Sequence, residues 1–171
     1  LAGNIEQLSF MPSIGFAVAA STLVGQNLGA RRPEEAMRSG WAATRLCAYF
    51  MGTMGLLFIL FPTFFVRIYT DDPAVIGAAA QILRIVGISQ LPQAIGFVSS
   101  GVLRGAGDTK AVLAFVFLGN VVIRLGLSYV FVVGLGWGLW SAYAAVFSDW
   151  IFRGVALYQW VRLGRWQKVA V

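Results

Sequence analysis

The stretch IVGISQLPQAIGFVSSGVLRGAGDTK, residues 85–110, decides the fold because it joins a long apolar run to a glycine-rich turn. Residues 85–103 carry one charge-free run, close to the roughly 20 residues that an α-helix needs to cross the hydrocarbon core of a membrane. Backbone groups inside lipid must pair within their own segment, which a helix achieves. We therefore predict a membrane-spanning helix that ends at this turn.

The glycine-rich end of the stretch does not have the spacing of a nucleotide site. A P-loop requires two glycines five residues apart, the second followed directly by lysine and a hydroxyl residue. Here Ala106 follows Gly101 at that distance, and Lys110 follows Gly105. A dinucleotide fingerprint beginning at Gly105 would need a third glycine where Lys110 stands. The segment is predicted to be a tight turn between two spanning helices, with Lys110 as an interfacial anchor.

The composition of the whole chain is that of a membrane protein. It is 58% hydrophobic and 12% charged, against roughly 45–50% and about 25% in soluble domains. The apolar runs lack the alternation of polar and apolar residues that a transmembrane β-barrel requires. We predict an all-α integral membrane protein. The uncharged runs of near-spanning length are residues 7–30, 46–66, 85–103 and 125–148.

Several classes of function are disfavoured by the residues themselves. The net charge of +6 comes from short basic clusters between apolar runs, so it indicates membrane topology and no nucleic-acid partner. The chain has no histidine, and its single cysteine, Cys47, lies inside an apolar run and is interpreted as a core thiol. No nucleophile and base pair is evident. We expect no enzyme activity, no cofactor and no metal site.

Five spanning helices are predicted. A single helix over residues 125–148 would place the glycines of GLGWG at its centre and leave the apolar run 111–123 outside any spanning helix. A break at GLGWG is the better division. The predicted helices cover residues 4–28, 41–68, 74–103, 111–133 and 139–161.

The basic residues give this arrangement an orientation. With five helices, nine of them fall on one face, which the positive-inside rule assigns to the cytoplasm together with the C-terminus. The opposite loops hold only Arg67, beside Asp71 and Asp72. An odd number of helices starts Leu1 outside the membrane, so at least one earlier helix is expected and the chain is interpreted as a fragment. The nine residues are Arg31, Arg32, Arg38, Arg45, Arg104, Lys110, Arg162, Arg165 and Lys168.

Charged groups inside a bilayer cost roughly 2.5–3.5 kcal/mol each on insertion scales, so they usually face a protein interior or a wet cavity. Glu6 stands with Asn4 and Gln7 near the predicted outer end of the first helix, just before Met11 and Pro12. Partly apolar surroundings disfavour the charged form of a carboxylate, which can then hold either a proton or a cation. The alternative is an interfacial Glu6 solvated by headgroup water.

Other polar residues in the spans also predict an interior cavity. Gln93 follows Pro92 near the middle of the third helix, where a proline frees a carbonyl group that must line a cavity or a bend. Asn120 and Arg124 are four residues apart and share a face of the fourth helix, which should turn inward. By contrast, Pro62 is interpreted as a bend near a helix end.

Asp149 and Arg153, four residues apart on the fifth helix, form an acid-then-base pair. Each can offset the cost of removing the other from water. We predict a structural ion pair within the membrane.

Three stretches resemble one known family. SFMPSIGFAVAASTLVGQNLGARRPEEA, LRIVGISQLPQAIGFVSSGVLRGAGDT and GLWSAYAAVF, followed by GRW, resemble the C-terminal half of multidrug and toxic compound extrusion (MATE) transporters, from about Asn4 to Trp166. The resemblance implies a complete protein of twelve helices in two six-helix lobes. Residues 1–171 would then be a partial C-terminal lobe, lacking the N-terminal lobe and the first helix of their own lobe.

The resemblance also implies a function. Such proteins are secondary antiporters of the cell inner membrane, which export organic, often cationic, compounds in exchange for protons or sodium ions by alternating access. Part of the family has an acidic cation ligand where this chain has Gln93, which cannot titrate, and often a proline where it has Gly126. The predicted coupling-ion or substrate cavity comprises Glu6, Asn4, Gln7, Met11, Gln93 and Asn120.

Two other functions stay open on the sequence. A related flippase for lipid-linked saccharides would need several basic cavity residues for a pyrophosphate, and Arg124 is one candidate. A membrane scaffold without transport would use its intramembrane polar residues only to hold helices together.

Overall fold

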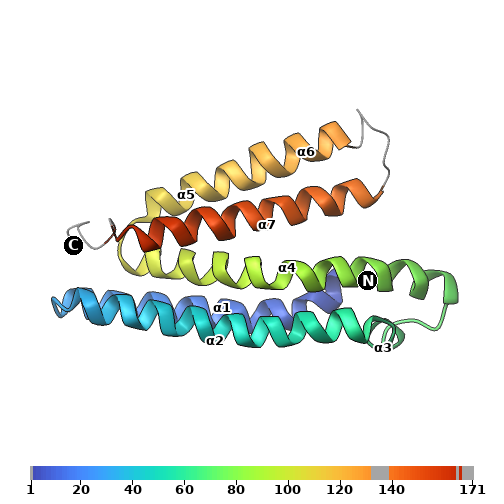
Figure 1. Ribbon diagram of the computed structural model, residues 1–171, viewed down its shortest axis with the longest axis horizontal. Coiled ribbons are helices and arrows are strands. Elements are labelled where there is room, and N and C mark those ends of the chain that lie inside the picture. The colour runs from blue at the N-terminus through green and yellow to red at the C-terminus, as the bar shows by residue number, and fades with distance from the viewer. Residues whose placement is uncertain (1, 132–138, 165, 167–171) are drawn as a thin grey trace.

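The computed structural model describes residues 2–131, 139–164 and 166, and every element among them is a helix. The helices run side by side in a long bundle (Figure 1). In chain order they are α1 (Ala2–Gly29), α2 (Pro33–Leu60), α3 (Pro62–Arg67), α4 (Pro73–Gly105), α5 (Thr109–Phe117), the π-helix η1 (Leu118–Leu125), α6 (Gly126–Tyr129) and α7 (Leu139–Arg162).

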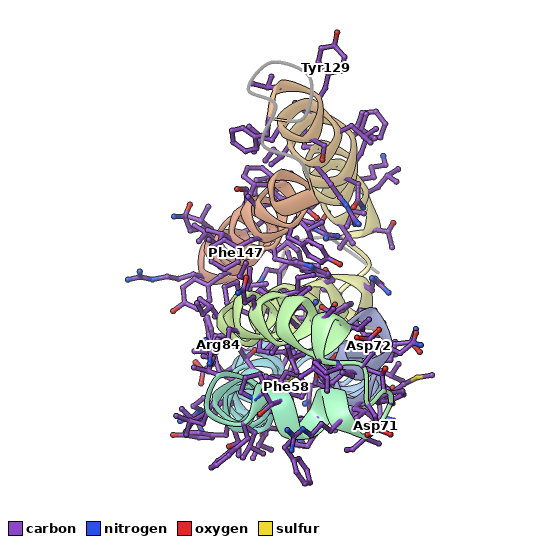
Figure 2. The ribbon with its side chains drawn as sticks, turned by 90° about the vertical axis from the view of Figure 1, so that its right-hand side faces the viewer. Phe58, Asp71, Asp72, Arg84, Tyr129 and Phe147 are labelled. Atoms are coloured by element: carbon purple, nitrogen blue, oxygen red, sulfur yellow. The ribbon has the colours of Figure 1, made fainter. Side chains whose placement is uncertain are left out.

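The helix α4 occupies the centre of the bundle. Figure 1 shows α1 and α2 on one side of it and α7 on the other, with the rod formed by α5, η1 and α6 outermost. Figure 2 looks along the bundle and shows Phe58 within the α2 layer facing α4, and Tyr129 projecting away at the far edge. α4 is therefore the element against which the other long helices are positioned.

The described helices have the dimensions and surface of membrane spans. Four stretches, residues 3–29, 33–60, 73–105 and 109–129, are long and apolar enough to cross a bilayer. α7, with 24 residues, lies beside α4. Large apolar side chains such as Leu113, Leu125 and Tyr129 are exposed on the bundle surface. The prediction of an all-α membrane protein is confirmed.

The contact between α1 and α4 depends on glycine. A Cβ atom at Gly101 would collide with the carbonyl oxygen of Ala17, and one at Gly105 would collide with that of Ser21. The four-residue spacing on both helices aligns these small residues in one stripe. Such small-residue stripes let helix backbones meet in a membrane, where apolar surface gains nothing by leaving lipid.

Glycines also allow close contact between α4 and its other neighbours, α2 and α7. A Cβ atom at Gly55 of α2 would lie 2.5 Å from the carbonyl oxygen of Gly87. One at Gly154 of α7 would lie 2.7 Å from the carbonyl oxygen of Pro92. Backbone thus packs directly on backbone at three interfaces of α4.

The turn between α1 and α2 and the turn between α4 and α5 lie at the same end of the bundle. We call it the basic end because it carries Arg31, Arg32, Arg104 and Lys110. After α4, the backbone amide of Asp108 donates a hydrogen bond to the carbonyl of Leu103 (2.9 Å), and that of Gly107 donates one to the carbonyl of Arg104 (3.1 Å). Gly107 has a left-handed φ of 80°. This arrangement is a helix C-cap known as a Schellman motif. The Asp108 carboxylate also accepts a bond from the indole of Trp160 (2.9 Å). The glycine-rich segment is a capped turn.

The turn after α1 is capped in the same way, but an arginine stands where the turn after α4 has a glycine. The backbone amide of Arg32 donates a hydrogen bond to the carbonyl of Asn27 (2.8 Å), and Arg31 has a left-handed φ of 59°. A side chain with a Cβ atom is strained in this region, where glycine is not.

The second predicted helix, residues 41–68, is wrong at both ends. α2 begins at Pro33, because proline at the first helical position and Glu34 and Glu35 in the first turn favour a helix start there. It ends at Leu60, and Pro62 starts the separate helix α3 instead of bending α2. Consequently Arg38, which lay outside the predicted helix, is on α2.

The fourth predicted helix, residues 111–133, contains an irregularity that the sequence did not indicate. Its middle, Leu118–Leu125, is π-helical, with wider turns than an α-helix. The predicted glycine break after this helix, residues 134–138, lies outside the described residues.

We predict that Gly101→Ala and Gly105→Ala each lower the free energy of unfolding by about 1–3 kcal/mol, because overpacking forces α1 away from α4. Thermal unfolding of the full-length protein in detergent measures this. The matched control is Gly77→Ala on the same helix, where nothing lies within 4 Å of the added Cβ atom. That control should be neutral or stabilise by up to about 1 kcal/mol. Equal effects of all three substitutions would contradict close packing.

The two capped turns should respond to substitution in opposite directions. Gly107→Ala should destabilise the protein by about 1 kcal/mol, because alanine is strained at positive φ, whereas Arg31→Gly should relieve that strain by a similar amount. Chemical or thermal unfolding curves of both variants test the pair. A stabilising Gly107→Ala would show that the turn has another conformation.

Candidate functional site

A cavity of about 400 Å³ opens between α1, α4, η1 and α7. Four polar side chains of the predicted spans line it: Glu6, Gln7, Gln93 and Arg124. Its lining is Gly3, Glu6, Gln7, Phe10, Met11, Ile14, Gln93, Arg124, Val146 and Trp150.

At the centre of this lining, Glu6 of α1 is joined to Gln93 of α4. The amide Nε2 of Gln93 donates a hydrogen bond of 3.1 Å to Oε1 of Glu6. Gln93 lies about 18 Å from the Gly105 end of α4 at 1.5 Å per residue, near the middle of a core about 30 Å thick. Glu6 lies near the N-terminal end of α1, as expected, and the described start of α1 lies part-way along α4 (Figure 1), so Glu6 is at the level of Gln93.

The pair leaves oxygen atoms free for chemistry. Gln93 is almost completely buried, and its Oε1 has no hydrogen-bond partner among the described residues. Glu6 is half-buried and keeps Oε2 free of any described bond. Carboxylate and amide oxygens are the atoms that hard cations prefer, and a protonated carboxyl group can also donate to an amide oxygen. The pair can accommodate either a cation or a proton.

The π-helix η1 supplies the cationic side chain of the cavity. Arg124 lies in its last turn and lines the cavity opposite Glu6 and Gln93. We predicted that Asn120 and Arg124 both face inward. Arg124 lines the cavity, but Asn120 is half-buried and does not line it.

The remaining predicted site residues divide in the same way. Gln7 and Met11 line the cavity with Glu6, since positions one turn apart share a helix face. Asn4 is exposed and does not line it.

Behind the cavity wall, Asp149 and Arg153 of α7 form a buried ion pair of 2.6 Å between Oδ2 and Nη2. The other carboxylate oxygen, Oδ1, has no described hydrogen-bond partner and faces Gly119, where a Cβ atom would collide with it. Arg124 is close enough to attract the same carboxylate. Asp149 therefore packs directly against the π-helix at Gly119.

An aromatic wall completes the cavity, and the sequence reasoning did not include it. Trp150 lines the cavity and lies 4.1 Å below the guanidinium of Arg153. Its ring contacts Phe97 at 5.2 Å between centroids, and Phe97 contacts Phe10 at 4.9 Å. The position of Trp150 next to the intramembrane Asp149 could have pointed to it. Helical spacing alone, however, does not show which face of α7 lines the cavity and which packs against other helices.

Comparison with known proteins places this architecture. The MatE family model matches residues 1–130. A probable multidrug resistance protein NorM of Thermotoga maritima is 35% identical, over 98% of this chain and 36% of its own length. Multidrug and toxin extrusion protein 1 of Homo sapiens is 31% identical, over 93% of this chain and 28% of its own length.

The fold has a counterpart among solved structures. An inward-facing multidrug resistance MATE family transporter of the MOP superfamily superimposes with a TM-score of 0.85 at 19% identity, covering 99% of this chain and 40% of its own chain. The chain spans about a third of the length of the curated relatives it matches. With matches over its family motifs, its length and its fold, the chain belongs to the MatE family.

Proposed function

We propose that the complete protein is a secondary antiporter that exports organic, often cationic, compounds in exchange for protons or sodium ions by alternating access. The observation that carries the proposal is the Glu6 carboxylate, bonded to Gln93 near mid-membrane inside a cavity. An acidic group at that depth is costly unless it binds something. The names of the relatives, which are multidrug resistance and extrusion proteins, agree with export.

The charges of the cavity support an exchange mechanism. With Glu6 ionised, its charge is balanced by Arg124, so the described lining is neutral. Adding a proton or a sodium ion at the Glu6 and Gln93 oxygens makes the cavity positive and weakens the binding of an organic cation. The two ligands then compete, as an antiporter requires. The ring faces of Phe10 and Trp150 offer an organic cation further attraction.

The orientation of the chain is part of the proposal. Both turns at the basic end carry arginine or lysine, so this end should face the cytoplasm and place the C-terminus there, in the cell inner membrane. The protein's other lobe would close the cavity on the side of α1. We propose neither an enzymatic reaction nor a cofactor other than the coupling ion.

The two alternative functions have less support. A lipid-linked saccharide flippase needs several basic groups around a pyrophosphate, whereas Arg124 is the one basic residue of the described lining. A scaffold needs no cavity, and its polar groups would be paired, yet Gln93 retains a free buried oxygen in the described residues.

In the full-length protein, Glu6→Gln should lower the initial rate of export of a fluorescent organic cation about tenfold or more, which corresponds to roughly 1.4 kcal/mol. The amide keeps the size of the side chain and its bond to Gln93 but can hold neither a proton nor a negative charge. Transport into vesicles under separate proton and sodium gradients measures the loss and identifies the coupling ion.

The control for this variant is Glu34→Gln, an exposed carboxylate in the first turn of α2 that should leave export unchanged. Membrane insertion and thermal stability of both variants should match those of the parent. Undiminished export by Glu6→Gln would remove this carboxylate from the mechanism.

Water should reach the cavity in the assembled protein. In a background with Cys47→Ala, Met11→Cys should react with a charged maleimide, and an organic cation should protect it. Leu56→Cys, on the exposed face of α2 and outside the described cavities, is the control that lipid should shield. A Met11→Cys variant that stays unlabelled would favour the scaffold over the transporter.

A further inference from the structure

A second hollow lies on the opposite side of α4 from the cavity. Two adjoining pockets of about 570 and 580 Å³ share Ile95 and Tyr158 and form one groove between α2, α4 and α7. Gln93, in the cavity, and Ile95, in the groove, are two residues apart, or about 200° around the helix. The groove is therefore separate from the proposed transport site.

The groove is basic at one end. Arg38 and Arg45 of α2 line one wall, and Arg162 at the end of α7 lines the other. All three are exposed, and none forms an ion pair with any described residue. Glu35, the acidic residue of α2 that does form one, pairs with Arg32 instead. Three arginines therefore line one groove without an ion-pair partner among the described residues.

An aromatic pair lies among the arginines of the groove. Trp41 stands between Arg38 and Arg45 on α2, about one turn from each, and its ring meets Tyr158 edge-on at 5.1 Å between centroids. Beyond this pair the groove is lined by aliphatic side chains that point outward, including Leu91 (49% exposed) and Val155 (51% exposed). Trp and Tyr with such surroundings mark the level of lipid headgroups in membrane proteins.

We propose that this groove binds one anionic phospholipid, with its phosphate on Arg38, Arg45 and Arg162 and an acyl chain along Leu91, Ile95 and Val155. Charge complementarity selects the occupant: guanidinium groups form paired hydrogen bonds with phosphate oxygens, and basic pockets between spanning helices are typical sites for anionic headgroups. The aliphatic half excludes a soluble phosphate compound as the natural ligand, because its exposed apolar surface fits a hydrocarbon chain.

The full-length protein, delipidated in detergent, provides the test. Adding phosphatidylglycerol or cardiolipin should raise its unfolding temperature saturably, whereas phosphatidylcholine should not. The triple variant Arg38→Gln, Arg45→Gln, Arg162→Gln should need a roughly tenfold or more higher lipid concentration for half of the effect, since each arginine contributes to attraction of the anionic lipid. Native mass spectrometry should show the loss of one bound lipid.

Two controls keep the experiment decisive. The double variant Arg67→Gln, Arg84→Gln, with exposed arginines outside the groove, should retain the response of the parent. If the triple variant fails to fold, Val155→Trp replaces it, because a bulky ring should block the acyl chain while leaving all three arginines. The proposal is overturned if phosphatidylcholine acts equally, if inorganic phosphate alone reproduces the shift, or if the groove variants respond like the parent.

Discussion

The direct packing of helix backbones around α4 is the constraint on which the rest of the structure depends. Gly101 and Gly105 let α1 approach, Gly87 and Gly55 let α2 approach, and Gly154 receives the carbonyl of Pro92. In a membrane these contacts replace the hydrophobic effect as the source of helix association. They also fix the register along the bundle, because a carbonyl oxygen that rests on a glycine cannot slide past a neighbouring side chain. The depth of Glu6 follows from that register, since α1 is held where its first turns meet the middle of α4.

The two faces of α4 then serve different purposes. One face carries Gln93 into a cavity that also contains a carboxylate, a guanidinium and an aromatic wall. The opposite face carries Ile95 and Leu91 into a groove whose open end is basic. Around the cavity the helices are irregular: η1 is a π-helix, a form often found at functional sites, and it presents Arg124 while Gly119 makes room for Asp149. Irregular structure is therefore concentrated where polar side chains must enter the bundle.

Much of the fold was predictable from the sequence, for physical reasons that are easily named. The length of the apolar runs and their lack of charged residues identify the spans. The basic residues correctly placed the turns after α1 and α4 at the same end of the bundle. Gln93 was identified because it follows Pro92 in an apolar run. The depth of Glu6 and the absence of Asn120 from the cavity were not predictable, since they depend on how neighbouring helices are shifted and rotated relative to each other. The predicted start of the second helix at residue 41 missed the helix-start signal at Pro33, which Glu34 and Glu35 of the first turn reinforce.

The central claim is that Glu6 and Gln93 act as one unit inside the membrane. A double-mutant cycle in the full-length protein, using Glu6→Ala, Gln93→Ala and their combination, tests this through the rate of cation export. Residues that share one interaction have non-additive effects, so we expect the double variant to lose less activity than the sum of the single losses, with a coupling of about 1 kcal/mol or more. Strictly additive losses would show that the two side chains act independently and are not one unit.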